Sequence, residues 1–395
     1  MPALSSIWGA PVRLASIASV AAYIRVAYRI RRWGRLPIHR GPTLVIANHQ
    51  HDLDDMAIIA QLTLDGPVRD PIFTVSSRRQ FEPGFLAVRL PWLGPLLRHY
   101  NPGPLFEVIG MRPIENQLAT RAVANLAWML HARHSKLHFR DLFHEATLQR
   151  LGIEDTRVSD VFSARWFARL QMNAKLSELR EPYRTEAIEM TRAQIDADLS
   201  SVEGLLKSGA TLYLAPEGRH TLDGHMGRFR GAFTRLAPLA QLYVVAMSYD
   251  PFLGNRLSAL YRVLRCDSPE QVEAVLRAAR PVTISQLLAE WIAAAGPSFS
   301  QQDAISAIRL RLESLPPALF VDPELRERPA AITRAALTKM TRLGLLRSEG
   351  SRFVLTQKRY HPSFAEVHDI LAYQVNFLGE TLAAVKRLDA DLVPT

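Results

Sequence analysis

The stretch Thr43-Leu44-Val45-Ile46-Ala47-Asn48-His49-Gln50-His51-Asp52-Leu53-Asp54-Asp55 decides the fold. Its first five residues are mostly apolar or β-branched and end at a polar residue, which predicts a buried strand. The segment 54–64 that follows has a helical pattern. A buried strand that leads into a helix is the basic unit of an α/β domain, in which ligands bind at the carboxyl ends of the strands. We therefore expect the polar residues after Ala47 to carry the chemistry.

Further short apolar runs, separated by proline and glycine, predict more strands. They are residues 71–75, 106–111, 211–215 and 242–247. Helical patterns alternate with these runs, and residues 115–207 are almost wholly helical in pattern. The fold class that we predict is α/β with a largely parallel sheet, formed by residues 37–265 and carrying a helical insertion at about residues 115–200.

The two ends of the chain differ from this middle part. Residues 1–36 predict an N-terminal amphipathic helix, and residues 266–395 predict a mostly helical C-terminal domain. In the C-terminal domain, helical patterns at 285–295, 300–314 and 329–343 precede a hairpin at 345–357 and a last helix at 363–388. Three helices and a hairpin are the order of a winged helix, so the chain of 395 residues is expected to hold two domains and an N-terminal helix.

The charge balance favours acidic partners. The chain has 48 Lys and Arg against 38 Asp and Glu, a net charge of +10. Nucleic acid, anionic lipid, a phosphorylated small molecule and an acidic carrier protein all fit this charge. A single cysteine, Cys266, excludes an intramolecular disulfide and fits a reducing, cytosolic setting. No apolar run reaches the roughly 18 residues typical of a membrane-spanning helix.

Residues 11–33 have the pattern of an interfacial helix. Successive residues of a helix are rotated by about 100° around its axis. This rotation places the apolar Ile17, Val20 and Ile24 on one side of the helix. It places the basic Arg25, Arg29 and Arg32 on another side. This arrangement predicts shallow insertion into a membrane surface, with the arginines at the lipid headgroups. A helix packed on the protein's own core is the alternative.

Two chemistries could use the histidines and carboxylates after the first strand. A His-x-His pattern begins some zinc sites, but Leu53 and Asp54 stand where a further acid and histidine are needed, so no metal is expected. The other chemistry is general-base catalysis by His49, oriented by Asp54. Five residues separate side chains by about 140° on a straight helix, so the pair meets only if His49 lies on the turn and Asp54 in the first helical turn.

A second polar block, Pro216-Glu217-Gly218-Arg219, follows the predicted strand 211–215. Gly218 permits a tight turn and Arg219 offers a fork of donors for a phosphate. Glu217 can orient a polar substrate group or that arginine. The alternative is a surface turn with an ion pair.

Taken together, these motifs resemble those of the glycerolipid acyltransferases, the glycerol-3-phosphate and lysophosphatidate acyltransferase family. Asn48-His49 with Asp54 is similar to its His-x4-Asp motif, and residues 216–219 resemble its Pro-Glu-Gly block. Residues 108–112 resemble a further block, a hydrophobic strand that ends in an arginine, here Arg112. The likeness covers residues 37–250. The chain departs from the family in the length of residues 115–190, in His220 after the block, and in the absence of proline from 244–247.

The resemblance implies an O-acyltransferase of phospholipid biosynthesis. It would move a fatty acyl group from an acyl-CoA or acyl-carrier-protein thioester to the hydroxyl of a glycerol phosphate or lysophospholipid. The implied catalytic residues are His49 and Asp54. The implied substrate-binding residues are Asn48, Arg112, Glu217, Gly218 and Arg219. The thioester is a co-substrate and no cofactor is implied. With residues 11–33 on a lipid surface, the protein is expected in the cytoplasm, peripheral at the inner face of the cytoplasmic membrane.

The competing interpretation is a binding protein. Basic Arg334, Lys339 and Arg342 on or near the third C-terminal helix would let a winged helix contact DNA or a protein, attached to an inactive lipid-binding domain. Acidic residues precede that helix and no dense basic and aromatic stripe is present, so no nucleic acid is expected. The intact pair of His49 and Asp54 argues against an inactive domain.

Overall fold

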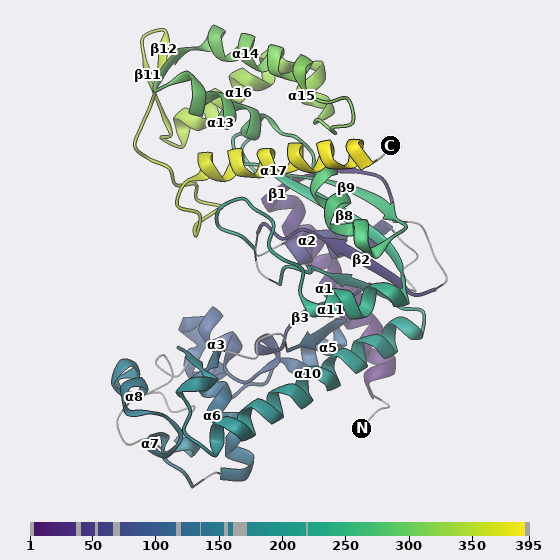
Figure 1. Ribbon diagram of the computed structural model, residues 1–395, viewed down its shortest axis with the longest axis vertical. Coiled ribbons are helices and arrows are strands. Elements are labelled where there is room, and N and C mark those ends of the chain that lie inside the picture. The colour runs from purple at the N-terminus through teal and green to yellow at the C-terminus, as the bar shows by residue number, and fades with distance from the viewer. Residues whose placement is uncertain are drawn as a thin grey trace. The chain divides into compact units, whose positions relative to one another are not determined.

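The protein is a mixed α/β chain with a mostly parallel central sheet and many helices, as the computed structural model shows (Figure 1). The structure describes residues 4–36, 41–51, 54–65, 72–115, 120–134, 136–153, 157–160, 172–218 and 220–391. Two compact units are present. The first unit comprises Met1–Leu14 and Phe73–Leu205, and the second unit comprises Ala15–Ile72 and Leu206–Thr395.

The sheet of the second unit contains the predicted first strand between two neighbours. Its strands lie in the order β1 (Tyr28–Trp33), β9 (Leu257–Cys266), β8 (Gln241–Asp250), β2 (Thr43–Ala47) and β7 (Thr211–Leu214). All neighbours in this order are parallel except β8 and β9. Every residue of β2 is buried, because β7 and β8 flank it on both edges. The strands predicted at 43–47, 211–215 and 242–247 are thereby confirmed, and so is the helix at 54–64, which is α2 (Asp54–Asp65).

The prediction of one helix over residues 11–33 is wrong. Helix α1 (Leu4–Ala27) ends six residues earlier, and β1 follows it directly. Residues Tyr28 to Trp33 pair in parallel with Leu257 to Arg262 of β9, so the sheet edge satisfies their backbone groups. Arg31 also donates two hydrogen bonds to the buried carboxylate of Asp322, at 2.6 and 2.5 Å. Tertiary pairing therefore overrides the local helical periodicity.

Strand β9 was not predicted from the sequence. It pairs antiparallel with β8 over nine residue pairs, in which Ala246 lies opposite Arg262. The central part of β9 is buried, but its charged residues Arg262 and Arg265 interrupt the apolar pattern. Arg262 stacks on the ring of Phe320 at 4.3 Å from the centroid, which covers that charge with an aromatic face.

The C-terminal helices are α12 (Val272–Ala278), α13 (Ile284–Ala295), α14 (Gln301–Ser314), α15 (Pro323–Glu327), α16 (Pro329–Arg342) and α17 (Ile370–Asp391). Helices α13, α14, α16 and α17 follow the predicted order, whereas α12 and α15 were not predicted and α17 begins at Ile370 instead of residue 363. The hairpin β11 (Leu346–Glu349) and β12 (Arg352–Leu355) turns at Gly350, whose φ is 62°, and β10 (Ser298–Ser300) completes a three-stranded sheet. Val263 and Leu287 belong to the same hydrophobic core, so residues before and after position 265 pack together. The domain boundary at that residue stays a prediction.

The first unit is mostly helical, and the interpretation of residues 115–200 as an insertion stays a prediction. Its helices are α3 (Phe85–Arg89), α4 (Gly94–Leu97), α5 (Gly103–Val108), α6 (Val123–His134), α7 (Phe139–Leu142), α8 (Glu145–Leu151) and α10 (Tyr183–Lys207). A short antiparallel pair, β5 (Thr120–Ala122) and β6 (Asn173–Lys175), interrupts them. Leu126, Leu130, Phe139 and Phe143 belong to a separate buried core of this unit.

The strand predicted at residues 106–111 is wrong in position. Residues 103–108 form α5, with Pro104 in its first turn, where the missing N–H costs nothing. Gly110 then adopts a φ of 99°, and β4 (Met111–Ile114) starts after it, parallel to β3 (Ile72–Ser77). The apolar run was therefore divided between the end of a helix and the start of a strand.

Candidate active site

The loop after β2 begins with a residue that joins two strands. Asn48 is buried, and its side-chain Nδ2 donates to the carbonyl oxygen of Met247 at 3.0 Å. In return, the N–H of Met247 donates to Oδ1 of Asn48 at 2.7 Å. Met247 belongs to β8, the neighbour of β2. Both polar ends of the amide are thus paired with backbone, which positions the loop. The substrate-binding role expected for Asn48 stays a prediction.

His49 and Asp54 meet in the way that the spacing requires. Nδ1 of His49 lies 3.2 Å from Oδ2 of Asp54. His49 lies on the turn after β2, and Asp54 is the first residue of α2. A hydrogen bond from Nδ1–H to the carboxylate leaves Nε2 as the ring nitrogen that can accept a proton. Among the residues that the structure describes, no hydrogen bond occupies Nε2 of His49.

Asp54 is held on both of its oxygens. Its Oδ2 also accepts the backbone N–H groups of Gln50, at 2.5 Å, and His51, at 2.8 Å. Its Oδ1 accepts a hydrogen bond from the hydroxyl of Tyr249, at the end of β8. The Asp54 side chain is fully buried, so these donors replace the water that a carboxylate requires. The same contacts hold the loop from 48 to 51 against the start of α2.

Several neighbouring charges change the pKa of His49. Burial opposes the charged imidazolium, but the hydrogen bond and charge of Asp54, with the charges of Asp55 and Glu217, outweigh it and raise the pKa of His49 from 6.5 to about 9. The side chain is 14% exposed, so screening by water is limited. His49 is therefore mostly protonated at neutral pH in the free protein. A proton must leave it before it can act as a base.

Glu217 connects the second polar block to this loop. Its Oε1 accepts the backbone N–H of His49 at 2.8 Å, and its Oε2 accepts the N–H of Gly227 at 2.7 Å. Burial raises the pKa of Glu217 to about 6, although these two backbone donors and the charge of Arg280 favour its ionised form. The residue is 4% exposed. Glu217 thus organises backbone on two sides, and its expected contact with substrate stays a prediction.

Gly218 forms the tight turn after β7. Its φ is 68°, and its N–H donates to Ala215 O at 3.1 Å. A Cβ at this position would lie 2.7 Å from Nε of Arg230, which donates to the carbonyl oxygen of Glu217 at 2.9 Å. Glycine is needed here both for the dihedral angle and for the space. Arg219, the expected phosphate-binding residue, lies outside the described residues.

These contacts engage the backbone amides nearest to His49 and Asp54. The N–H of His49 is bonded to Glu217, and those of Gln50 and His51 are bonded to Asp54. The N–H of Gly218 is bonded within its turn. The loop after β2 and the turn at Gly218 therefore offer these N–H groups only to the partners named here.

Comparison with known proteins adds no relative. Neither a family model nor a curated protein matches this sequence. The likeness to the glycerolipid acyltransferases therefore stays a prediction from the sequence motifs.

The two other histidines of this region differ in their surroundings. The His220 ring meets the His49 ring edge-on, with centroids 5.6 Å apart, and its Nε2 lies 3.3 Å from Glu366. The His51 side chain instead bonds to the carbonyl oxygen of Ser363 at 2.9 Å and packs against Tyr249. His220 is thus an imidazole beside the candidate base, whereas His51 ties the loop to the chain before α17.

A buried ion pair behind the site was not predicted. Arg280 is fully buried, lies 4.1 Å from the centroid of the Phe377 ring and donates to Glu380 of α17 at 2.8 Å. Glu380 also accepts the N–H of Met226 at 3.0 Å, next to the Gly227 that Glu217 binds. Neither Arg280 nor Glu380 stands in a motif, and the partners are 100 positions apart, so no local pattern could have indicated them.

Arg112 belongs to the first unit, on β4. Its guanidinium donates to the carbonyl oxygens of Glu107, at 2.8 Å, and Met111, at 2.9 Å, and lies 4.9 Å from the centroid of the Phe73 ring. These contacts fix the side chain at the end of α5. The role expected for it, binding the acceptor phosphate, stays a prediction.

The described residues contain neither a cluster of metal ligands nor a helix that could span a membrane. Within those ranges, His, Cys, Asp and Glu side chains form no group of three that could hold a metal ion. None of the helices in the described ranges is long and apolar enough to cross a membrane.

Proposed function

We propose that the protein is an acyltransferase that uses His49 as its general base. The observation that carries this proposal is the hydrogen bond between His49 Nδ1 and Asp54 Oδ2 at the carboxyl end of a buried central strand. That arrangement supplies an oriented imidazole where α/β proteins bind ligands. The fold that we propose for residues 37–265 is that of the glycerolipid acyltransferases.

The reaction follows from the chemistry of a thioester. Nε2 of His49 takes the proton of the acceptor hydroxyl as its oxygen attacks the carbonyl carbon. The new C–O bond forms, the C–S bond breaks, and the thiolate takes the proton from the imidazolium. Asp54 holds the ring in position and stabilises its charged form. The sequence of steps is balanced and requires no covalent acyl-enzyme.

The substrate class is proposed from the resemblance and the charge. The donor is an acyl-CoA or acyl-carrier-protein thioester, and the acceptor is a glycerol phosphate or lysophospholipid, with Arg112 and Arg219 as the residues proposed to bind its phosphate. Binding a remote phosphate would orient the hydroxyl toward His49. The net charge of +10 suits these acidic substrates. A location at the inner face of the cytoplasmic membrane is part of this proposal.

The test compares His49→Ala with a matched control, His144→Ala. His144 is exposed in the first unit and its side chain has no part in the proposed reaction. Each protein is incubated with acyl-CoA or acyl-carrier-protein thioester and with glycerol-3-phosphate, lysophosphatidate or water. The wild type and H144A should acylate one acceptor, and H49A should lose this activity by at least about a thousandfold. Equal turnover by H49A and the wild type would refute the assignment.

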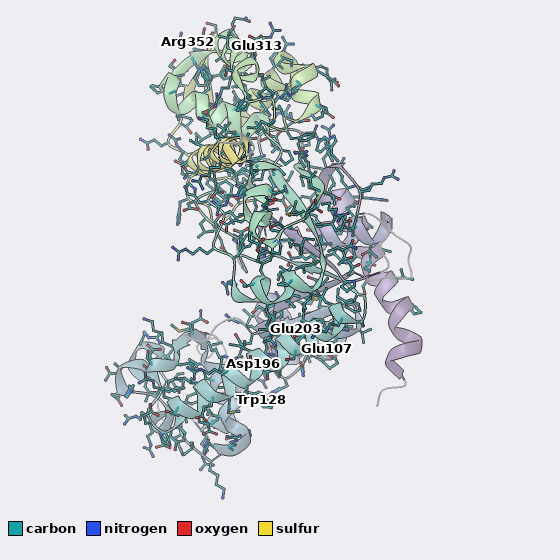
Figure 2. All side chains as sticks on the ribbon, turned by 45° about the vertical axis from the view of Figure 1, so that its right-hand side comes forward. Glu107, Trp128, Asp196, Glu203, Glu313 and Arg352 are labelled. Atoms are coloured by element: carbon teal, nitrogen blue, oxygen red, sulfur yellow. The ribbon has the colours of Figure 1, made fainter. Side chains whose placement is uncertain are left out.

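A second candidate function is suggested by the C-terminal part of the second unit. The order of α13, β10, α14, α16 and the β11–β12 hairpin is that of a winged helix. Arg352 of the hairpin is occupied by Ser298, donating to its Oγ and carbonyl oxygen at 2.9 Å each. The acidic Glu313 is labelled at the same end of this region (Figure 2). DNA retention that falls steeply with salt would support nucleic-acid binding, and no retention at low salt would exclude it.

A further inference from the structure

A cavity of about 420 Å³ lies in the second unit where α1 meets β1. Four arginines line it: Arg25, Arg29, Arg32 and Arg256. The remaining lining residues are uncharged, and they include Tyr28 and Tyr261. We call this cavity the arginine pocket. Its volume falls within the range of small-molecule sites in proteins, about 300–1,000 Å³.

The positive charge of the arginine pocket is only partly neutralised. Arg29 donates to Glu324 at 2.7 Å, which offsets one of the four charges. Nη1 of Arg256 donates to the carbonyl oxygen of Arg25 at 2.6 Å, and this acceptor is neutral. In the part of the chain that the structure describes, neither Arg25 nor Arg256 has a carboxylate partner. Two guanidinium groups thus remain to pair with an anion from outside.

The arginines come from three separate segments. Arg25 lies in the last turn of α1, Arg29 and Arg32 lie on β1, and Arg256 precedes β9. The helix dipole favours a cation in the last turn of a helix, which accounts for Arg25 alone. It does not account for the other three arginines that line the same cavity. Guanidinium groups present planar forks of donors that match the oxygens of a phosphate.

We propose that the arginine pocket binds a phosphate group, at a site distinct from the catalytic loop. Tyr28 separates the two: it lines the pocket, is only 8% exposed, and its ring meets the ring of His51 edge-on at 6.0 Å. The phosphate belongs either to a soluble molecule or to the headgroup of an anionic phospholipid. On α1, beside Arg25, the apolar side chains of Tyr23 and Val26 are 58% and 74% exposed.

The experiment uses the full chain and two variants with the same loss of charge. In Arg25→Gln/Arg256→Gln, the two pocket arginines without carboxylate partners are neutralised. In the control Arg309→Gln/Arg326→Gln, two exposed arginines outside the pocket are neutralised. Binding of inorganic pyrophosphate is measured by calorimetry. Binding to vesicles is measured by flotation, with phosphatidylcholine alone or mixed with phosphatidylglycerol. Neither binding measurement depends on acyl transfer. A negative result would therefore refute the phosphate site without refuting the proposed function.

We expect the pocket variant to lose binding by at least about tenfold while the control keeps it, because each charge-assisted hydrogen bond contributes strongly to anion affinity. Loss with pyrophosphate identifies a soluble phosphate ligand. Loss confined to vesicles with phosphatidylglycerol identifies a lipid headgroup. Equal losses in both variants would show a general charge effect and overturn the proposal. So would binding by the pocket variant equal to that of the wild type, or no binding by the wild type to either probe.

Discussion

The carboxylate of Glu217 accepts the backbone N–H of His49 at 2.8 Å, across 168 positions of the chain. Its other oxygen accepts the N–H of Gly227 at 2.7 Å. One buried side chain thus joins the loop after β2 to the turn after β7 and to the segment that follows it. The two polar blocks of the sequence form one hydrogen-bonded unit in the second unit of the fold. A change in either block is therefore expected to alter the position of His49.

The rate of acyl transfer is expected to increase with pH. The neutral imidazole is the base, and the pKa of His49 is raised to about 9. At limiting substrate, kcat/KM should rise about tenfold per pH unit from pH 7 and level off near pH 9. NMR titration of the His49 ring in the same samples links the plateau to this residue. A rate that is constant from pH 7 to pH 9 would contradict the assigned role.

The stability of the protein should depend on the same proton. The folded pKa of His49 lies above its unfolded value of 6.5, so protonation favours the folded state. This contribution is fully present below pH 6.5 and is lost as the pH rises through about 9. It amounts to about 3 kcal/mol as an order of magnitude. Urea unfolding of the wild type and of His49→Gln, at pH 6 and above pH 9, measures it as a difference. A wild-type advantage that is the same at both pH values would show that the proton does not contribute.

Asp54→Asn should impair catalysis far more than Asp55→Asn. The amide cannot hold the His49 ring as the carboxylate does, so kcat should fall by about a thousandfold or more. It should also lower the pKa of His49, because the hydrogen bond and charge of Asp54 are the strongest effects that raise it. Asp55 has no hydrogen bond to His49, so the Asp55→Asn variant should keep a kcat within about tenfold of the wild-type value. Similar losses in D54N and D55N would mean that only local charge matters.

Gly218→Ala should destabilise the protein, whereas Gly231→Ala should not. A Cβ at position 218 would approach Arg230 to 2.7 Å on a backbone with φ of 68°, which we expect to cost about 1–3 kcal/mol. A Cβ at Gly231 would meet nothing within 4 Å. Thermal unfolding of the two variants gives the comparison. Equal melting temperatures would show that the turn relaxes without strain.

Much of the fold could be predicted because its central strands contain short, mostly apolar runs. The run from Thr43 to Ala47 is buried on all sides, so its pattern is continuous and its polar end is sharp. Strand β7 and the stretch 242–247 of β8 have similarly continuous, mostly apolar patterns. The prediction failed where a distant strand decides the local structure. Residues Tyr28 to Trp33 have helical periodicity, but they form a strand because they pair with β9. Local pattern cannot report a partner that lies more than 200 residues away.

The contact between His49 and Asp54 could be predicted from their spacing, since they are five residues apart at one strand-to-helix turn. Their supporting residues could not be. Tyr249 donates to Asp54 from the end of β8, and Arg280 is paired with Glu380 of α17. Each of these contacts joins segments that are far apart in the chain and carries no local signal in residue type or spacing.

The sequence by itself determined the α/β class, the central strand and the proximity of His49 to Asp54, because these depend on periodicity and on short spacing. Tertiary structure alone decided the conversion of residues 28–33 into an edge strand, the place of Glu217 between two backbone segments and the convergence of arginines on one pocket. Those features arise from long-range pairing and burial. Burial and the surrounding charges also set the pKa of His49, which no pattern of residues along the chain expresses.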